Sequence, residues 1–332
     1  MKILVTGHRG YIGPHLVKLL KEAGHHVTGV DIGYFEGCNW EPLPAADREI
    51  NADFRTLTEK DLEGFDCVCH LAAISNDPMG DLDEKLTYDT NRDGSIELAH
   101  RAKKAGVPRY LFSGSCSVYG MGEKLDLDET ANFNPVSAYA VSKVETEKQV
   151  GPLADKNFSP AFLRNATAYG YSPNLRIDLV ANNLLACAIA RGDIRIMSDG
   201  SPWRPLVHCH DIARAFVVFA EAPREKIHNL AVNIGANEQN YQVRDVGDAV
   251  AKLVPSAKIV YTGETGPDPR NYRVNFDKLY SLFPTFHLKY NLQSGLEELL
   301  AKYREHKFSL KDFEGDQFVR LRAIKKKIVT KK

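Results

Sequence analysis

Short apolar runs alternate with amphipathic stretches along the first 165 residues, and this alternation constrains the fold more than any other feature. Five runs have the length and apolar content of buried strands, namely Lys2–Thr6, His26–Asp31, Asp66–Ala72, Tyr110–Ser113 and Pro160–Leu163. Residues 11–23, 88–105 and 138–150 have helical periodicity, and Gly24 and Gly106 follow two of these stretches as helix stops. Fully apolar strands separated by helices predict a parallel sheet wound on both faces.

The pattern loosens after about Tyr169, where helical and extended segments become mixed. We expect helices at Leu175–Arg191, Asp211–Ala222, Val243–Val254 and Leu292–Arg304, strands at Leu230–Ile234 and Lys258–Tyr261, and loops at Gly200–Pro205 and Gly263–Pro269. We therefore predict a doubly wound, Rossmann-type α/β domain over residues 1–168 and a smaller mixed domain over 169–318, with some interleaving between the two. Residues 319–332 are expected to form a solvated basic tail.

The charge balance argues against two classes of partner. The 332 residues include 43 basic and 43 acidic side chains, so we expect neither a nucleic-acid nor a membrane partner. No apolar run approaches the ~20 residues that span a bilayer, and the first residues lack the layout of a signal peptide. The six cysteines lack the spacing of a zinc site or a disulfide framework. We therefore expect no metal and a reducing, cytoplasmic setting.

A glycine-rich turn joins the first strand to the first helix. Gly7, Gly10 and Gly13 are spaced Gly-x-x-Gly-x-x-Gly, and glycines in this context let the backbone approach a pyrophosphate at a helix N-terminus. Asp31 ends the second strand and can accept hydrogen bonds from the adenosine ribose, which favours NAD as the cofactor. Arg9 lies inside the turn and would suit the 2′-phosphate of NADP. We weigh Asp31 more heavily because its position addresses the ribose directly.

Tyr139 and Lys143 stand four residues apart in the predicted helix 138–150, so their side chains share one face. A phenol has an ordinary pKa of ~10, which is too high for a good base at neutral pH. A nearby ammonium group favours the phenolate and lowers that pKa. Such pairs are frequent on ordinary helices, but beside a dinucleotide this one suits proton removal from an alcohol.

With these motifs the chain resembles, over nearly its whole length, the extended short-chain dehydrogenase/reductase superfamily. Within it, the chain is most similar to the NAD-dependent nucleotide-sugar epimerases and dehydratases. The resemblance implies an enzyme that binds NAD and a nucleotide-diphosphate sugar, with Ser115, Tyr139 and Lys143 as its catalytic residues. The residues it implies in cofactor binding are Gly7, Arg9, Gly10, Tyr11, Ile12, Gly13, Asp31, Asp53, Phe54, Leu71, Ala72, Ala73, Asn91, Ser113, Tyr139 and Lys143.

The resemblance also implies substrate contacts from both halves of the chain. The residues concerned are Ser115, Cys116, Ser117, Thr167, Asn182, Asn183, Arg204 and Arg270. Arg204 and Arg270 suit the diphosphate because a planar guanidinium matches phosphate oxygens. Thr167 replaces an asparagine that the family often has, and Asn165 stands two residues earlier. Asp211 is expected to cap the helix that follows it.

Several net reactions are compatible with such a site. The 4,6-dehydratases carry Thr-Asp-Glu where this chain has Ser115-Cys-Ser117, which argues against dehydration. The cysteine base of 3,5-epimerases would fall on Ser117. We therefore expect an epimerase acting at carbon 4 of the hexose through a transient 4-keto intermediate. A 4-dehydrogenase or 4-ketoreductase with net redox change is the first alternative, and a non-catalytic dinucleotide-sensing scaffold is the second. The resemblance further implies a homodimer formed through helices 88–105 and 138–150.

Overall fold

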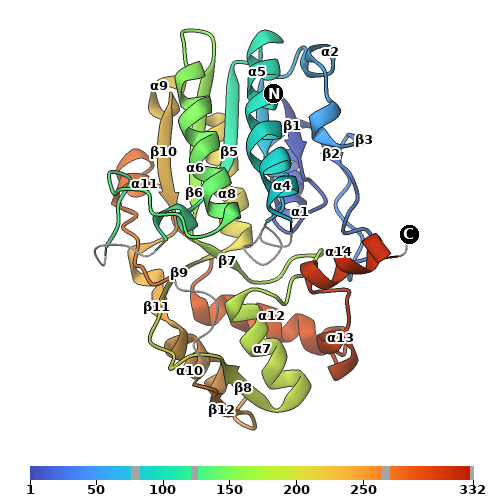
Figure 1. Ribbon diagram of the computed structural model, residues 1–332, viewed down its shortest axis with the longest axis vertical. Helices are drawn as coiled ribbons and strands as arrows, with labels where there is room; N and C mark the ends of the chain where they lie inside the picture. Colours follow the sequence, from blue (N-terminus) through green and yellow to red (C-terminus); the bar gives the residue numbers. More distant parts are fainter. Residues whose placement is uncertain (76–82, 121–125, 264–269, 330–332) are drawn as a thin grey trace.

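The computed structural model describes residues 1–75, 83–120, 126–263 and 270–329. Its larger lobe is built on a sheet of seven parallel strands in the order β10-β6-β5-β4-β1-β2-β3 (Figure 1). The strands are β1 Lys2–Thr6, β2 His26–Asp31, β3 Arg48–Asn51, β4 Cys67–His70, β5 Arg109–Ser115, β6 Ser159–Asn165 and β10 Leu230–Ile234. The predicted doubly wound parallel sheet is confirmed.

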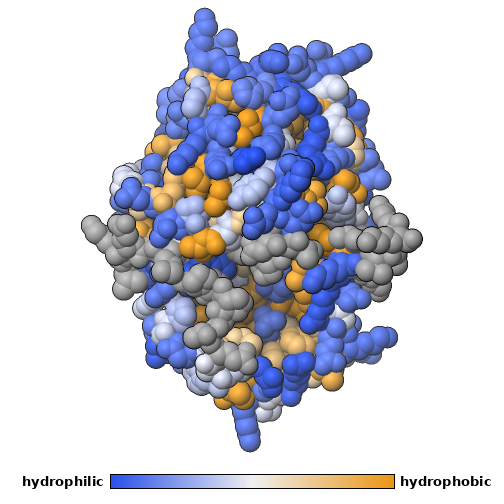
Figure 2. All heavy atoms as spheres, viewed as in Figure 1, coloured by the Kyte–Doolittle hydropathy of each residue, from blue (hydrophilic) through white to orange (hydrophobic). Residues whose placement is uncertain are grey.

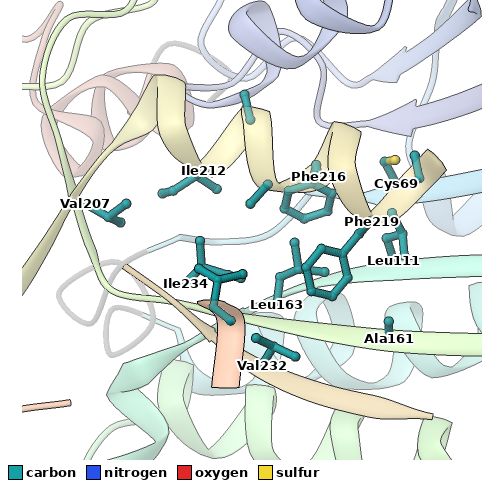
Figure 3. Packing of buried hydrophobic residues seen from close by; sticks show 14 of the residues in the cluster. Cys69, Leu111, Ala161, Leu163, Val207, Ile212, Phe216, Phe219, Val232 and Ile234 are labelled. Atoms are coloured by element: carbon teal, nitrogen blue, oxygen red, sulfur yellow. The ribbon is translucent and has the colours of Figure 1, made fainter. Parts of the chain in front are cut away.

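Helices cover both faces of this sheet. Helices α1 (Gly13–Glu22) and α8 (Cys209–Glu221) pack together on one face, while α5 (Gly94–Lys104) and α6 (Ala138–Val150) are neighbours on the other. Successive β1 side chains divide between two cores: Ile3 and Val5 join the cluster of α1 and α8, and Leu4 joins that of α5. This division follows from the two-residue period of a strand. Figure 3 shows part of the first core, where Ile212, Phe216 and Phe219 of α8 lie against strands β5, β6 and β10.

The smaller lobe lies below the large sheet in Figure 1 and has its own apolar core. A three-stranded sheet contains β7 Thr167–Tyr169, β9 Trp203–His208 and β11 Asn240–Gln242, and a parallel pair contains β8 Asp193–Ile196 and β12 Lys258–Tyr261. Its longer helices are α7 Val180–Arg191, α10 Val243–Leu253, α12 Leu292–Glu305 and α14 Arg320–Val329. Shorter helices among the described residues are α2 Glu59–Leu62, α4 Glu84–Thr87, α9 Arg224–Ile227, α11 Asp277–Leu282 and α13 Leu310–Glu314. Four 3₁₀ turns add Phe54–Thr56, Cys116–Tyr119, Gly151–Leu153 and Asn237–Gln239.

Strand β10 does not follow the predicted division of the chain into two domains. This strand comes from the second half of the sequence but pairs with β6, with Leu230 opposite Ala161 and Ile234 opposite Asn165. The interleaving thus adds an edge strand to the first lobe. The boundary at residue 168 stays a prediction.

Some expected elements differ from the observed ones. The chain is helical before residue 88, and Tyr88–Asp93 forms a π-helical turn between α4 and α5. Helix α7 starts five residues later than expected because 175–179 follow an irregular path, and β9 begins inside the predicted loop 200–205. Most of the predicted loop 263–269 lies outside the described residues. The weakly apolar strand β3 was not expected.

The basic segment 319–332 is not a solvated tail throughout. Arg320 and Ala323 are buried, as is Phe318 just before the segment, and Arg320 opens helix α14. Helix α14 lies beside the junction of the two lobes (Figure 1), a position that a tail prediction based on charge alone overlooked. Residues 330–332 lie outside the described part of the chain.

The surface in Figure 2 is mainly hydrophilic, with apolar side chains scattered among charged ones. Across the described residues, no helix combines the length and apolarity that crossing a bilayer requires.

Candidate active site

A cavity of about 630 Å³ opens at the carboxyl ends of β1, β2, β4, β5 and β6 and extends to residues of the smaller lobe. Ligands of open parallel sheets bind at this edge. The predicted site residues that line the cavity are Gly7, Gly10, Tyr11, Ile12, Gly13, Asp31, Asp53, Phe54, Leu71, Ala72, Ala73, Ser113, Ser115, Tyr139, Lys143, Thr167, Asn183, Arg204 and Arg270. Predicted site residues as far apart in the sequence as Gly7 and Arg270 therefore face one space.

Close backbone approaches explain the glycines at the start of this cavity. A Cβ at Gly7, whose φ is +72°, would stand 2.7 Å from the Ala72 nitrogen, and one at Gly13 would stand 2.3 Å from the His8 carbonyl oxygen. Ile12 is the N-cap residue of α1, and its apolar side chain cannot cap the amides of the first turn. A glycine-lined helix start without a side-chain cap fits a pyrophosphate, which would accept hydrogen bonds from these amides.

Asp31 is held at the end of β2 by two backbone amides. Its Oδ1 accepts from the Gly33 amide at 2.8 Å and its Oδ2 from the Arg9 amide at 3.1 Å. The Arg9 guanidinium points elsewhere, with Nη2 3.7 Å from a Glu49 oxygen. Asp31 lines the cavity and Arg9 does not, which favours the interpretation of Asp31 as the ribose contact.

The carboxylate of Asp53 accepts several hydrogen bonds from Arg55. Both Asp53 oxygens accept from Arg55 Nε at 3.1 and 3.0 Å, and Oδ2 also accepts from Nη2 at 2.6 Å. Burial opposes ionisation of Asp53, but the hydrogen bonds from Arg55 prevail and hold the pKa of Asp53 below its ordinary value. Arg55 also lines the cavity, so its guanidinium, held in place by Asp53, is part of this end of the site.

Tyr139 and Lys143 lie on one face of α6 and face the cavity, as their spacing predicts. The Lys143 Nζ lies 5.6 Å from the centre of the Tyr139 ring and 4.6 Å from that of Phe112, and it donates to the Ser113 carbonyl at 2.8 Å. Lys143 is buried, and this burial lowers its pKa to about 7. An anion formed beside the ammonium would therefore be strongly stabilised, since little water competes there.

Ser115 ends β5 on the cavity wall. Its Oγ accepts from the Ser117 amide at 3.1 Å and so caps the 3₁₀ turn Cys116–Tyr119. The cap leaves the hydroxyl proton available for donation to a ligand. Ser115, Tyr139 and Lys143 thus border one space and together can exchange a proton with a bound alcohol.

The structure does not bring every expected ligand contact to the cavity. Cys116 is fully buried and its Sγ donates to the Arg164 carbonyl at 3.1 Å, while Ser117 is buried beside it. Burial raises the pKa of the Cys116 thiol, which makes it a poor base. The predicted substrate contacts of Cys116 and Ser117 are therefore wrong for the described structure, because the 3₁₀ turn directs both side chains into the core.

Asn91 and Asn182 also act from behind the cavity wall. Asn91 accepts from the Ile74 amide at 2.7 Å and donates to the Ile74 carbonyl at 2.9 Å, which braces the loop after β4. Asn182 is fully buried and spans Gly170, Arg176 and Tyr11. Neither residue lines the cavity, so both support ligand-facing segments instead of touching a ligand directly.

Asp211 has a structural role, but not the expected one. His208 is the N-cap residue of α8, and its Nδ1 accepts from the His210 amide at 3.2 Å. Asp211 is fully buried, and its two oxygens accept from the amides of Lys289 and Tyr290 at 2.8 and 3.0 Å. Asp211 therefore holds the segment that contains Lys289 and Tyr290 against the first turn of α8.

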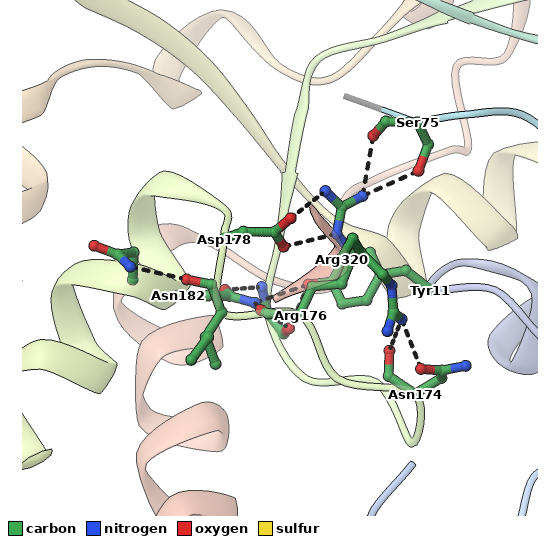
Figure 4. A network of polar contacts seen from close by, with 10 residues as sticks. Tyr11, Ser75, Asn174, Arg176, Asp178, Asn182 and Arg320 are labelled. Atoms are coloured by element: carbon green, nitrogen blue, oxygen red, sulfur yellow. Dashed lines mark hydrogen bonds and ion pairs between the residues drawn. The ribbon is translucent and has the colours of Figure 1, made fainter. Parts of the chain in front are cut away.

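The cavity contains residues that sequence reasoning did not assign to it. Asn165 donates from Nδ2 to Ser113 Oγ at 3.0 Å, and its buried Oδ1 has no hydrogen-bond partner among the described residues. Arg176 and Asp178 form a buried ion pair on the wall, with Arg176 Nε 2.9 Å from Asp178 Oδ1 (Figure 4). Arg176 and Asp178 stand in the otherwise apolar run 175–181. Opposite charges in such a run indicate a buried ion pair, and this signal could have predicted it from the sequence.

One acidic cluster lies outside this cavity. Glu41, Glu305 and His306 are close enough to share a cation, but Glu41 already accepts from Lys302 at 2.8 Å. The cluster is therefore explained by its own ion pairs.

The fold is a doubly wound parallel sheet, and the cavity at its carboxyl edge is lined by the glycine turn, Tyr139 and Lys143. The model of the NAD dependent epimerase/dehydratase family matches residues 3–235, and the chain belongs to that family, whose cofactor is NAD.

Three relatives illustrate this membership. The chain is 28% identical to a UDP-glucose 4-epimerase of Corynebacterium glutamicum over 263 residues, which are 74% of this chain and 78% of the relative. It is 27% identical to the solved structure of MoeE5 with UDP-glucuronic acid and NAD, with a TM-score of 0.80. A UDP-glucose 4-epimerase from Thermotoga maritima, solved with UDP-glucose, is 25% identical with a TM-score of 0.79. Each structure covers 92% of this chain and 99% of its own.

Proposed function

We propose that this enzyme epimerises a UDP-hexose at carbon 4 through a transient 4-keto sugar. The observation that carries the proposal is the shared cavity of the glycine turn, Ser115, Tyr139 and Lys143. Those residues suit reversible oxidation of one hydroxyl, and two of the relatives described above are UDP-glucose 4-epimerases. The departure of Ser115-Cys-Ser117 from the dehydratase pattern points the same way.

In the proposed reaction Tyr139, as its phenolate, accepts the proton of the 4-hydroxyl while Ser115 hydrogen-bonds the same oxygen. NAD, held by the residues of the glycine turn, would supply a reversible acceptor for the hydride of carbon 4. The Lys143 ammonium stabilises the phenolate, and the surrounding burial strengthens that attraction. When the ketone is reduced, Tyr139 returns the proton, so protons and hydride are conserved over the cycle.

The sugar must turn between the two hydride transfers while its nucleotide stays in place. Arg204, Arg270, Asn183 and Thr167 line the smaller-lobe side of the cavity. The Arg204 Nη1 donates to the carbonyls of Trp203 and Arg270, which joins the two arginine segments. We propose that these residues bind the UDP diphosphate, since arginines match phosphate oxygens and Thr167 supplies a hydroxyl.

The test is a substrate assay without added cofactor. Purified holoenzyme is incubated in D₂O with UDP-glucose, UDP-galactose, UDP-glucuronic acid and UDP-N-acetylglucosamine, and products are followed by proton NMR. We expect one 4-epimer pair to interconvert without deuterium at carbon 4, because hydride transfer conserves that hydrogen. Stoichiometric NADH, or dependence on added NAD(P)H, would instead support a 4-dehydrogenase or 4-ketoreductase. Deuterium in the product would indicate C–H deprotonation and contradict the proposal.

Two further properties belong to the same proposal. The enzyme is proposed to be a homodimer joined through α5 and α6, as the family resemblance implies. We also propose a reducing, cytoplasmic setting, for which the six buried, free cysteines are the support.

A further inference from the structure

Helix α14 carries an arginine into the cavity wall. Arg320 is only 1% exposed, and it lines the same cavity as Gly10, Tyr11 and Phe35. Its guanidinium lies 4.3 Å above the centre of the Phe35 ring. A long basic side chain buried from a C-terminal helix is unusual, because lysines and arginines are rarely buried without a charged partner.

The position of Arg320 is set by Asn174, which also contacts the glycine turn. Arg320 Nη2 donates to Asn174 Oδ1 at 2.6 Å and to the Asn174 carbonyl at 3.1 Å (Figure 4). Asn174 Nδ2 in turn donates to the Arg9 carbonyl within the turn. One asparagine therefore joins the guanidinium of α14 to the loop at which a dinucleotide pyrophosphate binds.

Among the described charged residues near Arg320, Asp178 is the acidic one, and it attracts both Arg320 and Arg176. Arg176 and Asp178 neutralise one another as a pair, and Arg320 adds a second guanidinium beside them. Burial and, after it, repulsion from Arg176 lower the pKa of Arg320 to about 10, so it stays charged at neutral pH. Its Nη1 is buried without a hydrogen-bond partner among the described residues. A buried charge and an unused donor are costly unless an anion meets them.

We propose that Arg320 binds the diphosphate of NAD together with the glycine turn, so that α14 holds the cofactor in the enzyme. The Nη1 group supplies a charge-assisted hydrogen bond to a phosphate oxygen, and the Phe35 and Asn174 contacts fix its direction. The family's cofactor is NAD, so this inference does not depend on which sugar carbon reacts. It does fit an epimerase, which regenerates its cofactor and has no need to exchange it.

The primary test compares NAD affinity in Arg320→Gln with that in Lys325→Ala, a matched control that removes an exposed charge from the same helix. Both proteins are stripped of dinucleotide, and NAD binding is measured by calorimetry. We expect Arg320→Gln to bind NAD roughly 10- to 100-fold more weakly, the range for one lost charge-assisted hydrogen bond. Lys325→Ala should match the parent, and Arg320→Lys should fall between. NAD affinity within twofold of the parent in Arg320→Gln would overturn the proposal.

A second measurement separates the cofactor from the substrate as the source of the phosphate. UDP binding to the NAD-saturated Arg320→Gln protein should stay within twofold of the parent. If UDP affinity fell while NAD affinity was unchanged, Arg320 would serve the substrate and the proposal would be wrong. Neither result depends on catalysis, so a failure of the 4-epimerase proposal would leave this test intact.

A third measurement needs no variant and remains decisive if Arg320→Gln does not fold. Hydrogen–deuterium exchange is followed in the parent apoenzyme with NAD or with UDP. NAD should slow amide exchange in residues 319–325, whereas UDP alone should not. Unchanged exchange in this segment on NAD binding would contradict a contact between α14 and the cofactor.

Discussion

At the scale of single residues, burial decides what Lys143 can do. The sequence places Lys143 one helical turn from Tyr139, which is enough to predict that the two share a face. Only the packed structure shows that the ammonium is buried beside Phe112 and donates to the Ser113 carbonyl. A solvated lysine at the same spacing would stabilise a phenolate far less, because water would screen it.

Replacing Tyr139 by phenylalanine removes the proposed base and preserves the ring. We expect turnover to fall roughly 10²- to 10⁴-fold, the range for general acid–base catalysis, with NAD still bound. The measurement is the initial rate of epimerisation with the substrate identified by the assay above. Tyr261→Phe is the matched control, because Tyr261 is exposed on β12 outside the cavity lining. Equal loss of activity in both variants would contradict a specific role for the Tyr139 hydroxyl.

The buried ammonium of Lys143 should also make stability depend on pH. Its pKa in the folded apoenzyme is about 7, below the ordinary value of 10.5, so the unfolded chain binds the proton more tightly. The destabilisation is therefore complete below pH 7 and disappears as pH rises toward 10.5. We expect apo Lys143→Met to melt above the parent at pH 6.5, and the gap to shrink toward pH 9.5. A gap that did not change with pH would contradict this expectation.

At the scale of elements, buried polar networks decide how strands and helices are joined. Arg164 on β6 pairs with Glu147 on α6 and donates from Nη1 to the Tyr119 hydroxyl at 2.9 Å. Tyr119 donates to Asn233 of β10 at 2.8 Å. The network joins the turn after β5, two strands and a helix directly behind the site. Hydrophobic periodicity cannot predict these hydrogen bonds and ion pairs, because the residues that form them are far apart in the sequence.

Breaking this network should cost much more stability than breaking an exposed ion pair. Arg164→Ala removes a buried guanidinium and leaves the partly buried Glu147 without its partner, for which we expect a loss of about 3–5 kcal/mol in the free energy of unfolding. Arg191→Ala breaks the partly exposed pair with Glu314 and should cost less than about 1 kcal/mol. Chemical denaturation of the two variants provides the comparison. Similar losses of unfolding free energy in the two variants would contradict the expectation that burial makes the Arg164–Glu147 pair more important for stability.

At the scale of the whole molecule, the site exists only because the two lobes are held in one arrangement. The Tyr11 hydroxyl donates to the Gly170 carbonyl, and Asn182 Nδ2 donates to the Tyr11 hydroxyl at 3.1 Å and to the Arg176 carbonyl at 2.7 Å. These contacts link the glycine turn to the segment before α7. Asn182 therefore acts as a support between the lobes.

Substitutions of the neighbouring residues Asn182 and Asn183 should distinguish a structural role between the lobes from a role in ligand binding. Asn182→Ala leaves several buried groups unsatisfied, each at a cost of roughly 1–3 kcal/mol, so we expect it mainly to lower the melting temperature. Asn183 lines the cavity and makes one hydrogen bond to the Ile177 carbonyl. Asn183→Ala should mainly raise KM for the sugar nucleotide. A reversal of the two phenotypes would place the ligand contact at Asn182.

The proposed dimer is tested by mass in solution. Sedimentation velocity of the holoenzyme at micromolar concentration should give a species of twice the mass of one chain. Hydrogen exchange should then be protected on α5 and α6 as the concentration rises. A single-chain mass at every concentration would contradict a homodimer.

The sequence by itself determined the class of fold and half of the site. Uninterrupted apolar runs and the glycines at 7, 10 and 13 specify local structure that needs no distant partner, because strand period, helix period and tight turns are local properties. The same reasoning correctly placed Asp31, Tyr139 and Lys143 at the cavity. It failed at Cys116 and Asn182, whose directions depend on a 3₁₀ turn and on contacts between lobes.

Only the tertiary structure decided which charges are buried together. Arg320 of α14 joins the pair Arg176 and Asp178 on the cavity wall, whereas the composition of the sequence alone predicts a solvated tail for Arg320. The physical reason is that the cost of a buried charge depends on every group packed around it. Sequence patterns report which residues prefer the interior, and the packed fold determines what they meet there.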